Sequence, residues 1–446
     1  MMTQQENAGL ESGPFYTKRW VQLVIGIICM ALVANLQYGW TLFVNPISTR
    51  HGWTRADIQV AFSIFILVET WFVPVEGWLV DRFGPRPVVA AGAILAALAW
   101  IVDSTAQSLP ALYLGGVLAG LGAGCVYGTC VGNALKLFPD KRGLAAGLTA
   151  AGFGAGAALT VIPIAHMIRT SGYEHTFMFF GVAQGVGIFI LSMFLIRRKA
   201  PKGVTVSKMN LASRVNTPPQ KMVRTPVFWV MYAIFVAVAT GGIMATAQIA
   251  PIAKDFGLNN MPITIFGLTL PLLTMTLSID SLCNGFTRPL SGWISDLIGR
   301  ENMMFIIFTC EGLAMLGLMH FGHHPAGFLI FAPLIFLCWG EIFSIFPAIS
   351  GDTFGPQFAT VNNGLLYTAK GTSSLLVPLA SLLAVGGRWD RVFVTAATMA
   401  IVAAFCAKFV LFPMRKRWID SQTHASETSA TLPAGAHTLL SEQAGE

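Results

Sequence analysis

The stretch SIDSLCNGFTR, residues 278–288, places an arginine deep inside a long apolar segment that runs from about Pro262 to Ile294. A cation at the centre of a membrane-spanning helix costs roughly 2.5–3.5 kcal/mol on insertion scales. A second cation, Lys370, stands in another apolar segment further along the chain. Packing does not account for two unneutralised cations at such depth, whereas a bound anion would. We therefore expect Arg288 and Lys370 to form an anion site inside a membrane protein.

Composition supports the membrane class. Of the 446 residues, 54% are hydrophobic and only 11% are charged, against a usual charged share of roughly 25%. A soluble protein of this size could not hide so much apolar surface, so the chain is predicted to be an all-α integral membrane protein. Its seven cysteines fall in apolar segments and form no CxxC pair. They are predicted to be small core residues, with no disulfide frame and no metal site.

Apolar runs long enough to cross a bilayer recur along the chain. A span needs about 20 apolar residues, and the first run is too long for the ~7–15-residue apolar core of a cleaved signal. Twelve transmembrane helices are predicted, at about 20–46, 56–80, 87–107, 110–137, 143–169, 175–197, 226–252, 262–294, 302–321, 325–350, 360–386 and 390–413.

The basic residues predict the orientation, because lysine and arginine favour cytoplasmic loops. Nineteen of them fall on the side of the two termini, and six on the other side, namely Arg50, Arg55, Arg169, Lys254, Arg388 and Arg391. We expect both termini to be cytoplasmic in a cell inner (plasma) membrane. This distribution also explains the net charge of +7 without any nucleic-acid partner.

The predicted spans divide into two sets of six. A cytoplasmic N-terminal tail (1–19) precedes the first six-helix bundle (20–197). A linker (198–225), rich in basic residues and proline and without an acidic residue, is expected to lie on anionic lipid headgroups. The second bundle (226–413) is followed by a cytoplasmic tail (414–446) that is expected to be disordered, because it lacks apolar periodicity.

The two halves repeat a polar loop motif. A D-x-x-G pattern with a basic residue follows the second span of each half, formed by Asp81, Arg82, Gly84 and Arg86 in the first and by Asp296, Gly299 and Arg300 in the second. Such a turn suits a charge latch between helix ends, although an ordinary hydrophilic turn is the alternative. Its recurrence at equivalent places indicates a duplicated six-helix unit.

These features resemble the major facilitator superfamily over about residues 18–415. A closer resemblance lies in five fragments, namely QYGWTL at 37–42 with Asn45-Pro46, FPDKRG at 138–143, Asn284-Gly285 to Arg288-Pro289, Trp339-Gly340, and Ala369-Lys370. Together they are similar to the oxalate:formate antiporter family and its monocarboxylate relatives. The resemblance implies the major facilitator fold, with twelve transmembrane helices in two pseudo-symmetric six-helix bundles.

The family resemblance also implies a substrate site. An arginine of the eighth helix and a lysine of the eleventh, here Arg288 and Lys370, are implied to hold substrate carboxylates inside an aromatic cage. The chemistry agrees, since the planar arginine fork matches a carboxylate and lysine adds a compact point charge. An internal salt bridge remains the alternative for each cation.

Polar and aromatic residues accompany the cations at helical spacing. Asn284 precedes Arg288 by four residues and shares its face. The other candidates for substrate binding are Gln37, Tyr38, Tyr127, Trp339, Phe343 and Tyr367. Core or lipid-facing packing is the alternative for each aromatic residue. The family pattern has a tryptophan in place of Tyr367 and a tyrosine in place of Phe343, which leaves the exact substrate open.

Four acidic residues also fall within spans, at Glu69, Asp280, Glu311 and Glu341. A buried carboxyl can neutralise a cation or carry a proton. Glu341 is two residues from Trp339 and is the expected partner of Lys370. Glu341, Glu69 and Asp280 are the candidates for coupling transport to protons. Asp280 lies about two turns, ~12 Å, from Arg288 along the helix, beyond direct pairing.

Three classes of protein remain for comparison. No loop carries a nucleophile–base pair or a metal cluster, which disfavours a membrane enzyme, and no signalling domain follows, which disfavours a sensor. No phosphate-binding loop motif appears, so neither ATP nor another cofactor is expected. We expect a secondary transporter, monomeric, that exchanges oxalate or a similar dicarboxylate for formate by alternating access. Proton-coupled monocarboxylate symport is the alternative.

Overall fold

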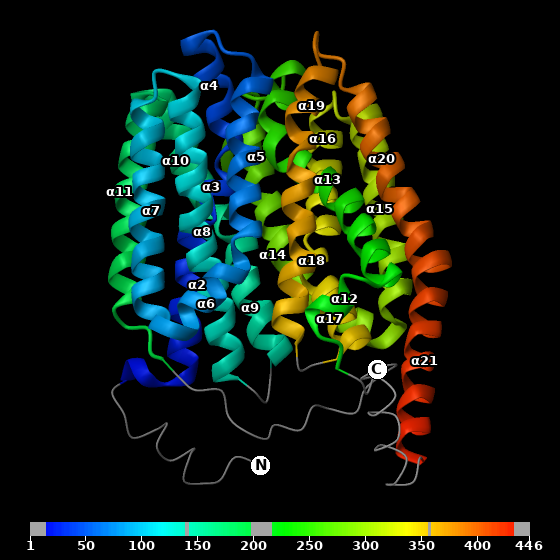
Figure 1. Ribbon diagram of the computed structural model, residues 1–446. Coiled ribbons are helices and arrows are strands. Elements are labelled where there is room, and N and C mark those ends of the chain that lie inside the picture. Colours follow the sequence, from blue (N-terminus) through cyan, green and yellow to red (C-terminus); the bar gives the residue numbers. More distant parts are fainter. Residues whose placement is uncertain (1–14, 139–141, 198–215, 356–357, 432–446) are drawn as a thin grey trace.

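The computed structural model describes residues 15–138, 142–197, 216–355 and 358–431. The helices run roughly along one axis and form two halves that lie side by side, with the N-terminal half in blue to green-cyan and the C-terminal half in green to red (Figure 1). The described chain begins and ends at the same end of the bundle. We call this the proximal end and the opposite one the distal end.

The N-terminal half contains a 3₁₀ turn and helices α2 to α11. Their bounds are η1 Phe15–Thr17, α2 Arg19–Val33, α3 Asn35–Tyr38, α4 Thr41–His51, α5 Arg55–Trp71, α6 Val73–Phe83, α7 Pro85–Thr105, α8 Leu109–Leu137, α9 Arg142–Ala155, α10 Ala157–Ser171 and α11 Tyr173–Ser192.

The C-terminal half contains helices α12 to α21, a two-stranded hairpin and a π-helical segment. Their bounds are α12 Pro219–Met222, α13 Pro226–Asp255, β1 Pro262–Ile265, β2 Leu268–Pro271, α14 Leu272–Ile298, α15 Arg300–Phe321, α16 Pro325–Trp339, α17 Ile342–Phe354, α18 Ala359–Ser374, α19 Leu376–Leu383, α20 Asp390–Phe405, η2 Cys406–Leu411 and α21 Phe412–Thr431.

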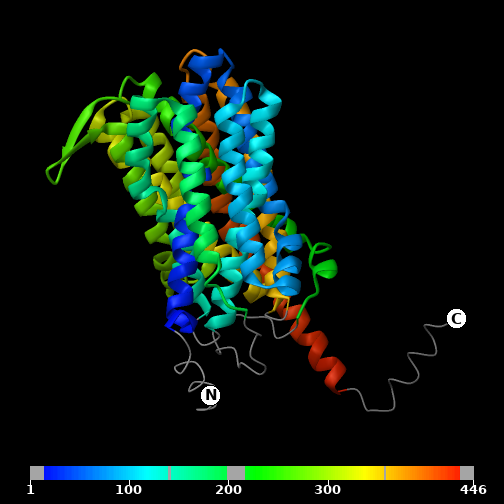
Figure 2. The same cartoon turned by 90° about the vertical axis from the view of Figure 1, so that its left-hand side faces the viewer.

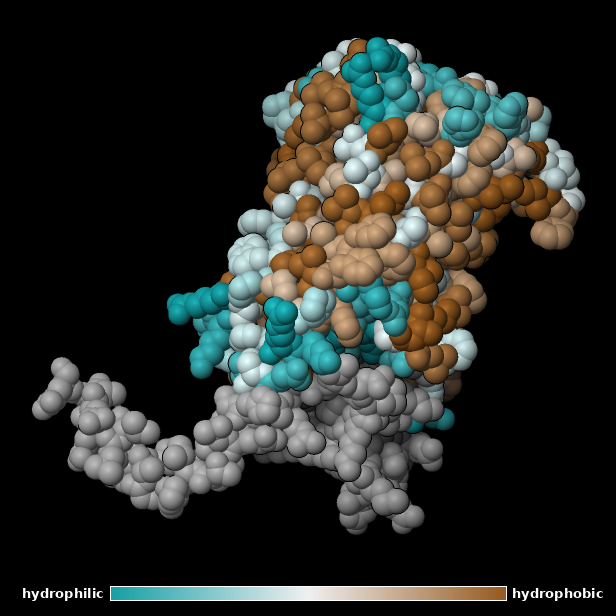
Figure 3. Space-filling model, turned by 90° about the vertical axis from the view of Figure 1, so that its right-hand side faces the viewer, coloured by the Kyte–Doolittle hydropathy of each residue, from teal (hydrophilic) through white to brown (hydrophobic). Residues whose placement is uncertain are grey.

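The surface fits a lipid environment. On the face seen in Figure 3, hydrophobic side chains form a broad belt, with hydrophilic ones gathered above and below it. Nine described helical segments are long and apolar enough to cross a membrane. Three expected spans are not among them, namely α5–α6, α14 and α18–α19. These three carry Glu69, Arg288 and Lys370, the charged residues that the sequence analysis and the ion pairs single out.

Several spans are interrupted near the middle of the bundle. The first span is divided into α2, α3 and α4, and α16 gives way to α17 at Gly340 and Glu341. Proline lies inside α4, α16 and α17, where it removes a backbone hydrogen bond and bends the helix. The interruptions place Tyr38 and Trp339 at helix ends, close to the centre of the protein.

The repeated loop motif has the same backbone shape in both halves. Gly84 joins α6 to α7 with a φ of 87°, and Gly299 joins α14 to α15 with a φ of 93°. These values lie in a region that favours glycine. The equivalent turns agree with the expected duplication of a six-helix unit.

The chain departs from the expected eighth span at its beginning. Residues 262–271 form an antiparallel hairpin, in which Pro262 faces Pro271 and Ile265 faces Leu268, and the helix begins only at Leu272. Figure 2 shows the hairpin projecting from the distal end. The segment alternates isoleucine, threonine and leucine around a Phe266-Gly267 turn, a pattern that favours strands. Apolarity alone did not distinguish this hairpin from a helix.

The expected disordered tail is also different in the structure. The chain continues as α21 to Thr431 (Figure 1). No proline or glycine occurs between Pro413 and Thr431. Arg415 fixes the start of the helix by donating to Thr353 Oγ1 at 2.7 Å and Glu301 Oε1 at 2.5 Å. Residues 432–446 lie outside the described residues, as do 198–215 of the basic linker.

The two halves approach closely where α9 crosses α14. A Cβ atom at Gly285 would lie 2.6 Å from Ala155 Cβ and 2.9 Å from the Ala155 backbone nitrogen. Helix α14 can meet α9 at this distance only because residue 285 lacks a side chain. The crossing lies one turn from Arg288, so it positions that side chain against the opposite half.

Replacing Gly285 with alanine is expected to reduce transport at least about fivefold, since the added methyl group meets backbone that cannot move aside, and overpacking costs about 1–3 kcal/mol. The matched control is Gly292→Ala on the same helix, because among the described residues a Cβ there would meet only the Ser344 side chain, at 3.7 Å from its Cβ and 4.0 Å from its Oγ. Initial uptake rates in liposomes, normalised to inserted protein, provide the measurement. Equal rates for the two variants would contradict this account of the crossing.

Candidate functional site

Lys370 lies at the centre of the protein and contacts the opposite half. Its side chain, on α18, is fully buried, and its Nζ atom is 2.8 Å from Glu69 Oε2 on α5. The same ammonium donates to Gln37 Oε1 at 3.1 Å and to the Tyr367 hydroxyl at 3.4 Å. A Cβ at Gly371 would lie 2.2 Å from Thr70 Oγ1. This close approach of α5 and α18 brings Glu69 to Lys370.

The pairing expected between Lys370 and Glu341 is therefore wrong. Glu341 is fully buried where α16 gives way to α17, and neither of its carboxylate oxygens has a hydrogen-bond partner among the described residues. The oxygens of Asp280 are likewise buried without a partner. Glu69 takes the place expected for Glu341 because α5, from the other half, packs on the face of α18 that carries Lys370.

Arg288 forms a second cross-half connection. It is 1% exposed on α14, and its Nη1 atom donates to the Ala150 carbonyl of α9 at 2.9 Å. Its Nη2 atom donates to Asn284 Oδ1 at 2.8 Å and to the Tyr38 hydroxyl at 3.3 Å. Tyr38 also donates to Asn284 Oδ1 at 3.2 Å. The three side chains form one buried network, and among the described residues no carboxylate is bonded to the arginine.

Aromatic rings surround both cations. The Arg288 guanidinium lies 4.3 Å from the centroid of the Phe343 ring, and the Lys370 ammonium lies 5.6 Å from the same centroid. The distance between the two charged groups is therefore no greater than the sum of these two distances. Tyr127 stacks on Tyr367 with centroids 6.0 Å apart, and Trp339 meets Phe343 edge to face at 5.4 Å.

The structure brings together the nine residues that the sequence nominates for substrate binding, and adds one more. Phe153 on α9 contacts Tyr38 at 5.7 Å and Tyr127 at 5.3 Å between centroids, and Lys370 Nζ is 5.8 Å from its ring. The sequence contains a signal for it, because Phe153 is the one aromatic in the run GFGAG at 152–156. An aromatic ring between glycines can reach a neighbouring helix without obstruction.

The charges of the site do not balance. Arg288 and Lys370 are positive, and Glu69 is the one carboxylate bonded to either of them among the described residues. With Glu69 ionised the site has a net charge of about +1. All three side chains are at most 1% exposed, so this charge acts in a medium of low dielectric constant, where it attracts an anion strongly.

Polar contacts close the halves against each other on the distal side of the site. Gln59 Nε2 donates to the Ala247 carbonyl at 2.7 Å, and Arg55 forms two hydrogen bonds with the Asp255 carboxylate, at 2.7 and 2.9 Å. The Trp389 indole also donates to Asp255, at 3.0 Å. The bonds of Gln59 and Arg55 join α5 of one half to α13 of the other, and the Trp389 bond holds Asp255 in place from within its own half.

The loop motifs lie at the proximal end, away from these cations. Arg300 pairs with Asp296 at 2.5 Å and with Asp352 at 3.3 Å. In the first half, Arg82 lies over the Trp78 ring at 5.3 Å, and the side chain of Asp81 lies outside the described residues. The arrangement contains breakable ion pairs, and the gating role remains a prediction.

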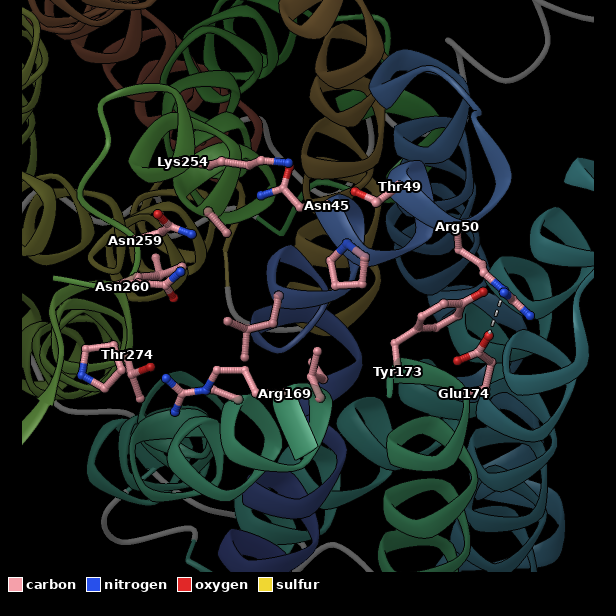
Figure 4. Close-up of a pocket in the computed structure, with 17 residues that line it drawn as sticks. Asn45, Thr49, Arg50, Arg169, Tyr173, Glu174, Lys254, Asn259, Asn260 and Thr274 are labelled. Atoms are coloured by element: carbon pink, nitrogen blue, oxygen red, sulfur yellow. Dashed lines mark ion pairs between the residues drawn. The ribbon is translucent and has the colours of Figure 1, made fainter. Parts of the chain in front are cut away.

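A cavity of about 780 Å³ opens between the halves at the distal end. Figure 4 shows the side chains around it, which come from α4, α10 and α11 on one side and from α13, the hairpin region and α14 on the other. Its wall includes Leu42, Ala250 and Leu273. Leu42 follows Tyr38 by four residues, about 6 Å along the helix axis, so the cavity leads toward the buried site.

Comparisons with known proteins agree with this architecture. The profile of the Major Facilitator Superfamily matches residues 23–369 and 260–441. The oxalate:formate antiporter of Oxalobacter formigenes is 33% identical, over 88% of this chain and 91% of that protein. Monocarboxylate transporter 11 of Mus musculus is 26% identical, over 67% of this chain and 64% of that protein.

A solved structure shares the fold. The structure of a peptide transporter, POT, in complex with sulfate superimposes with a TM-score of 0.68, and the match covers 93% of this chain and 99% of that one. The two sequences are 15% identical. This likeness therefore concerns the arrangement of helices alone.

Proposed function

This chain belongs to the Major Facilitator Superfamily and is a multi-pass membrane transporter rather than an enzyme, and from that premise we propose that it carries small carboxylates. The binding site is the central cluster around Arg288 and Lys370. The orientation expected from the basic residues places the proximal end in the cytoplasm and the protein in the plasma membrane.

Three buried N–H donors carry this proposal. Arg288 Nε, Gln37 Nε2 and Trp339 Nε1 have no hydrogen-bond partner among the described residues. A buried donor without a partner costs about 1–3 kcal/mol, and three at one site form a poor protein core. Together with a net positive charge, they suit a small anion that accepts several hydrogen bonds. A carboxylate has two oxygens for this purpose.

Oxalate, or a similar dicarboxylate, exchanged for formate is the proposed transport reaction. The 33% identical relative has the name oxalate:formate antiporter, and the candidate residues here supply one planar cation and one point cation. A dianion can accept from both at once. Formate, with a single negative charge, matches the net charge of about +1 that Glu69 leaves in the site.

The contacts that the two cations make across the halves support alternating access as the proposed mechanism. Arg288 bonds to Ala150 and Tyr38, and Lys370 bonds to Glu69 and Gln37, so both C-terminal cations hold N-terminal groups. A bound carboxylate would compete for the same donors. When the carboxylate enters, it replaces the direct bonds between the halves with bonds from each half to the substrate. The halves then stay connected while they rotate relative to each other.

Counterflow in liposomes tests the proposed exchange. Labelled oxalate is expected to enter liposomes that contain formate or oxalate about tenfold or more faster than liposomes without an internal anion, because an empty carrier must move an unneutralised arginine. Protein-free liposomes control for leakage, and an amino acid of similar size controls for charge. Uptake of the amino acid but not of oxalate would refute the carboxylate assignment.

Proton-coupled monocarboxylate symport is the second candidate, and the Lys370–Glu69 pair is the observation that favours it. A carboxyl inside the site can hold a proton while the substrate occupies the lysine. Symport predicts that an inward proton gradient drives net formate accumulation in liposomes without an internal anion. Exchange predicts no accumulation beyond that of protein-free liposomes under the same gradient, into which neutral formic acid diffuses.

A further inference from the structure

We propose that the distal cavity is a second anion-binding site, which holds a small carboxylate before it enters the central site. The identity of the anion rests on the proposed function. The capacity of the cavity to bind anions does not, since it depends on residues that lie outside the central cluster.

The cavity has an excess of positive charge. Three of its lining residues are basic, namely Arg50, Arg169 and Lys254, and one is acidic, Glu174. Glu174 is 3.7 Å from Arg50 (Figure 4), and within the described part of the chain no ion pair involves Arg169 or Lys254. The acidic neighbour of Lys254, Asp255, is already held by Arg55 and Trp389. Two cations of the cavity are therefore left to attract an anion.

These two cations come from different halves. Arg169 is at the end of α10, and Lys254 at the end of α13. In Figure 4 they project into the cavity from opposite sides. An anion between them would contact both halves, as it would in the central site. Amide and hydroxyl groups of Asn259, Asn260 and Thr274 add neutral donors along the same wall.

The size of the cavity predicts a loose mode of binding. A volume of about 780 Å³ is far larger than a small dicarboxylate, so the ligand keeps most of its water. Low-dielectric walls of one charge sign concentrate counter-ions and raise their rate of arrival. We therefore expect weak, salt-sensitive capture in the cavity, in contrast to the desolvated central site.

A cysteine at Thr49, a lining residue of the cavity, provides a direct measurement. Thr49→Cys is placed in the full chain with Arg288→Ala, so that the central site does not contribute. The measured quantity is the ratio of two rates of cysteine modification, that with an anionic thiosulfonate divided by that with a cationic thiosulfonate of similar size. Protein without Thr49→Cys corrects for the native cysteines.

Arg169→Gln and Lys254→Gln are each expected to lower this ratio about tenfold, because one charge some 6 Å away in a water-like medium changes the rates of the two reagents about threefold in opposite directions. The matched control is Arg391→Gln, which removes the same charge from the distal end outside the cavity. Oxalate is expected to slow the anionic reagent, whereas chloride at equal ionic strength does not. An unchanged ratio in both cavity variants, or equal effects of oxalate and chloride, overturns the proposal.

Transport separates this proposal from the function on which it rests. In protein with an intact central site, Arg169→Gln with Lys254→Gln is expected to raise the KM for oxalate from the distal side with little change in maximal rate. A cavity that prefers anions in a protein that transports no carboxylate would refute the proposed function alone. Normal carboxylate exchange with an unaltered KM in the double variant would refute the cavity site alone.

Discussion

Arg288→Ala is expected to abolish carboxylate exchange while the protein still inserts in the membrane. In the proposed site the side chain offers charge-assisted hydrogen bonds to the substrate, worth about 1.5–3 kcal/mol each, and two of them correspond to a loss of roughly 100-fold or more. No carboxylate is bonded to Arg288 among the described residues, so its removal leaves no buried charge without a partner. Folding should therefore survive the change.

Oxalate–oxalate exchange in liposomes, normalised to inserted protein, measures this effect. Arg388→Ala, a distal-end arginine outside the central site and the cavity, is the control and should exchange at the original rate. Arg288→Lys should recover little activity, because an ammonium cannot form the planar two-point contact. Undiminished exchange by Arg288→Ala would remove the arginine from the substrate site.

Glu69→Gln is expected to change the preferred substrate charge. The substitution keeps the shape of the side chain but raises the charge of the site from about +1 to +2. Two charges some 6 Å apart in a medium of effective dielectric constant near 20 interact by about 3 kcal/mol. We expect the ratio of oxalate to formate transport to rise at least about tenfold, measured as initial rates on the same liposome preparation.

Lys370→Gln should move the same ratio in the opposite direction, although it has a second effect. It leaves the Glu69 carboxylate buried without its cation, and breaking a buried pair costs about 3–5 kcal/mol. Glu69→Gln combined with Lys370→Gln removes both charges and should restore the amount of folded protein. If Lys370→Gln in properly folded protein reduces oxalate and formate transport equally, Lys370 is a structural or gating residue.

Much of the fold follows from composition and spacing alone. The scarcity of charge and the length of the apolar runs predict a helical membrane protein, and the prediction of the major facilitator fold is confirmed. The count of twelve spans stays a prediction, because only nine described helical segments are both long and apolar enough to cross a membrane. The three other expected spans carry Glu69, Arg288 and Lys370.

The hairpin at 262–271 shows where apolarity misleads. A run of isoleucine, leucine and threonine is compatible with either a helix or a strand, and the turn at Phe266 and Gly267 decides between them. Phe266 has a φ of 50° and is fully exposed. The turn residues Phe266 and Gly267 therefore predict the hairpin better than the length of the apolar run predicts a helix.

The site was predictable in its members but not in its pairing. Arg288, Lys370 and Asn284 could be recognised because charged or amide groups inside apolar segments require an explanation. The partner of Lys370 could not, since Glu69 is 301 residues away in sequence, and helical spacing relates residues on one helix only. The closeness of Glu341 to Trp339 in sequence favours Glu341 as the partner, whereas the contact of Lys370 with Glu69 is set by how α5 packs on α18.

The Lys370–Glu69 ion pair has a consequence for how tightly the two fluxes are coupled. Because Glu69 neutralises one cation when no substrate is bound, only Arg288 opposes the return of an empty carrier. Under the proposed exchange we therefore expect some slippage, with a flux ratio that departs from one-for-one. Glu69→Gln leaves two uncompensated cations, so the variant should slip less often and its exchange stoichiometry should approach one-for-one.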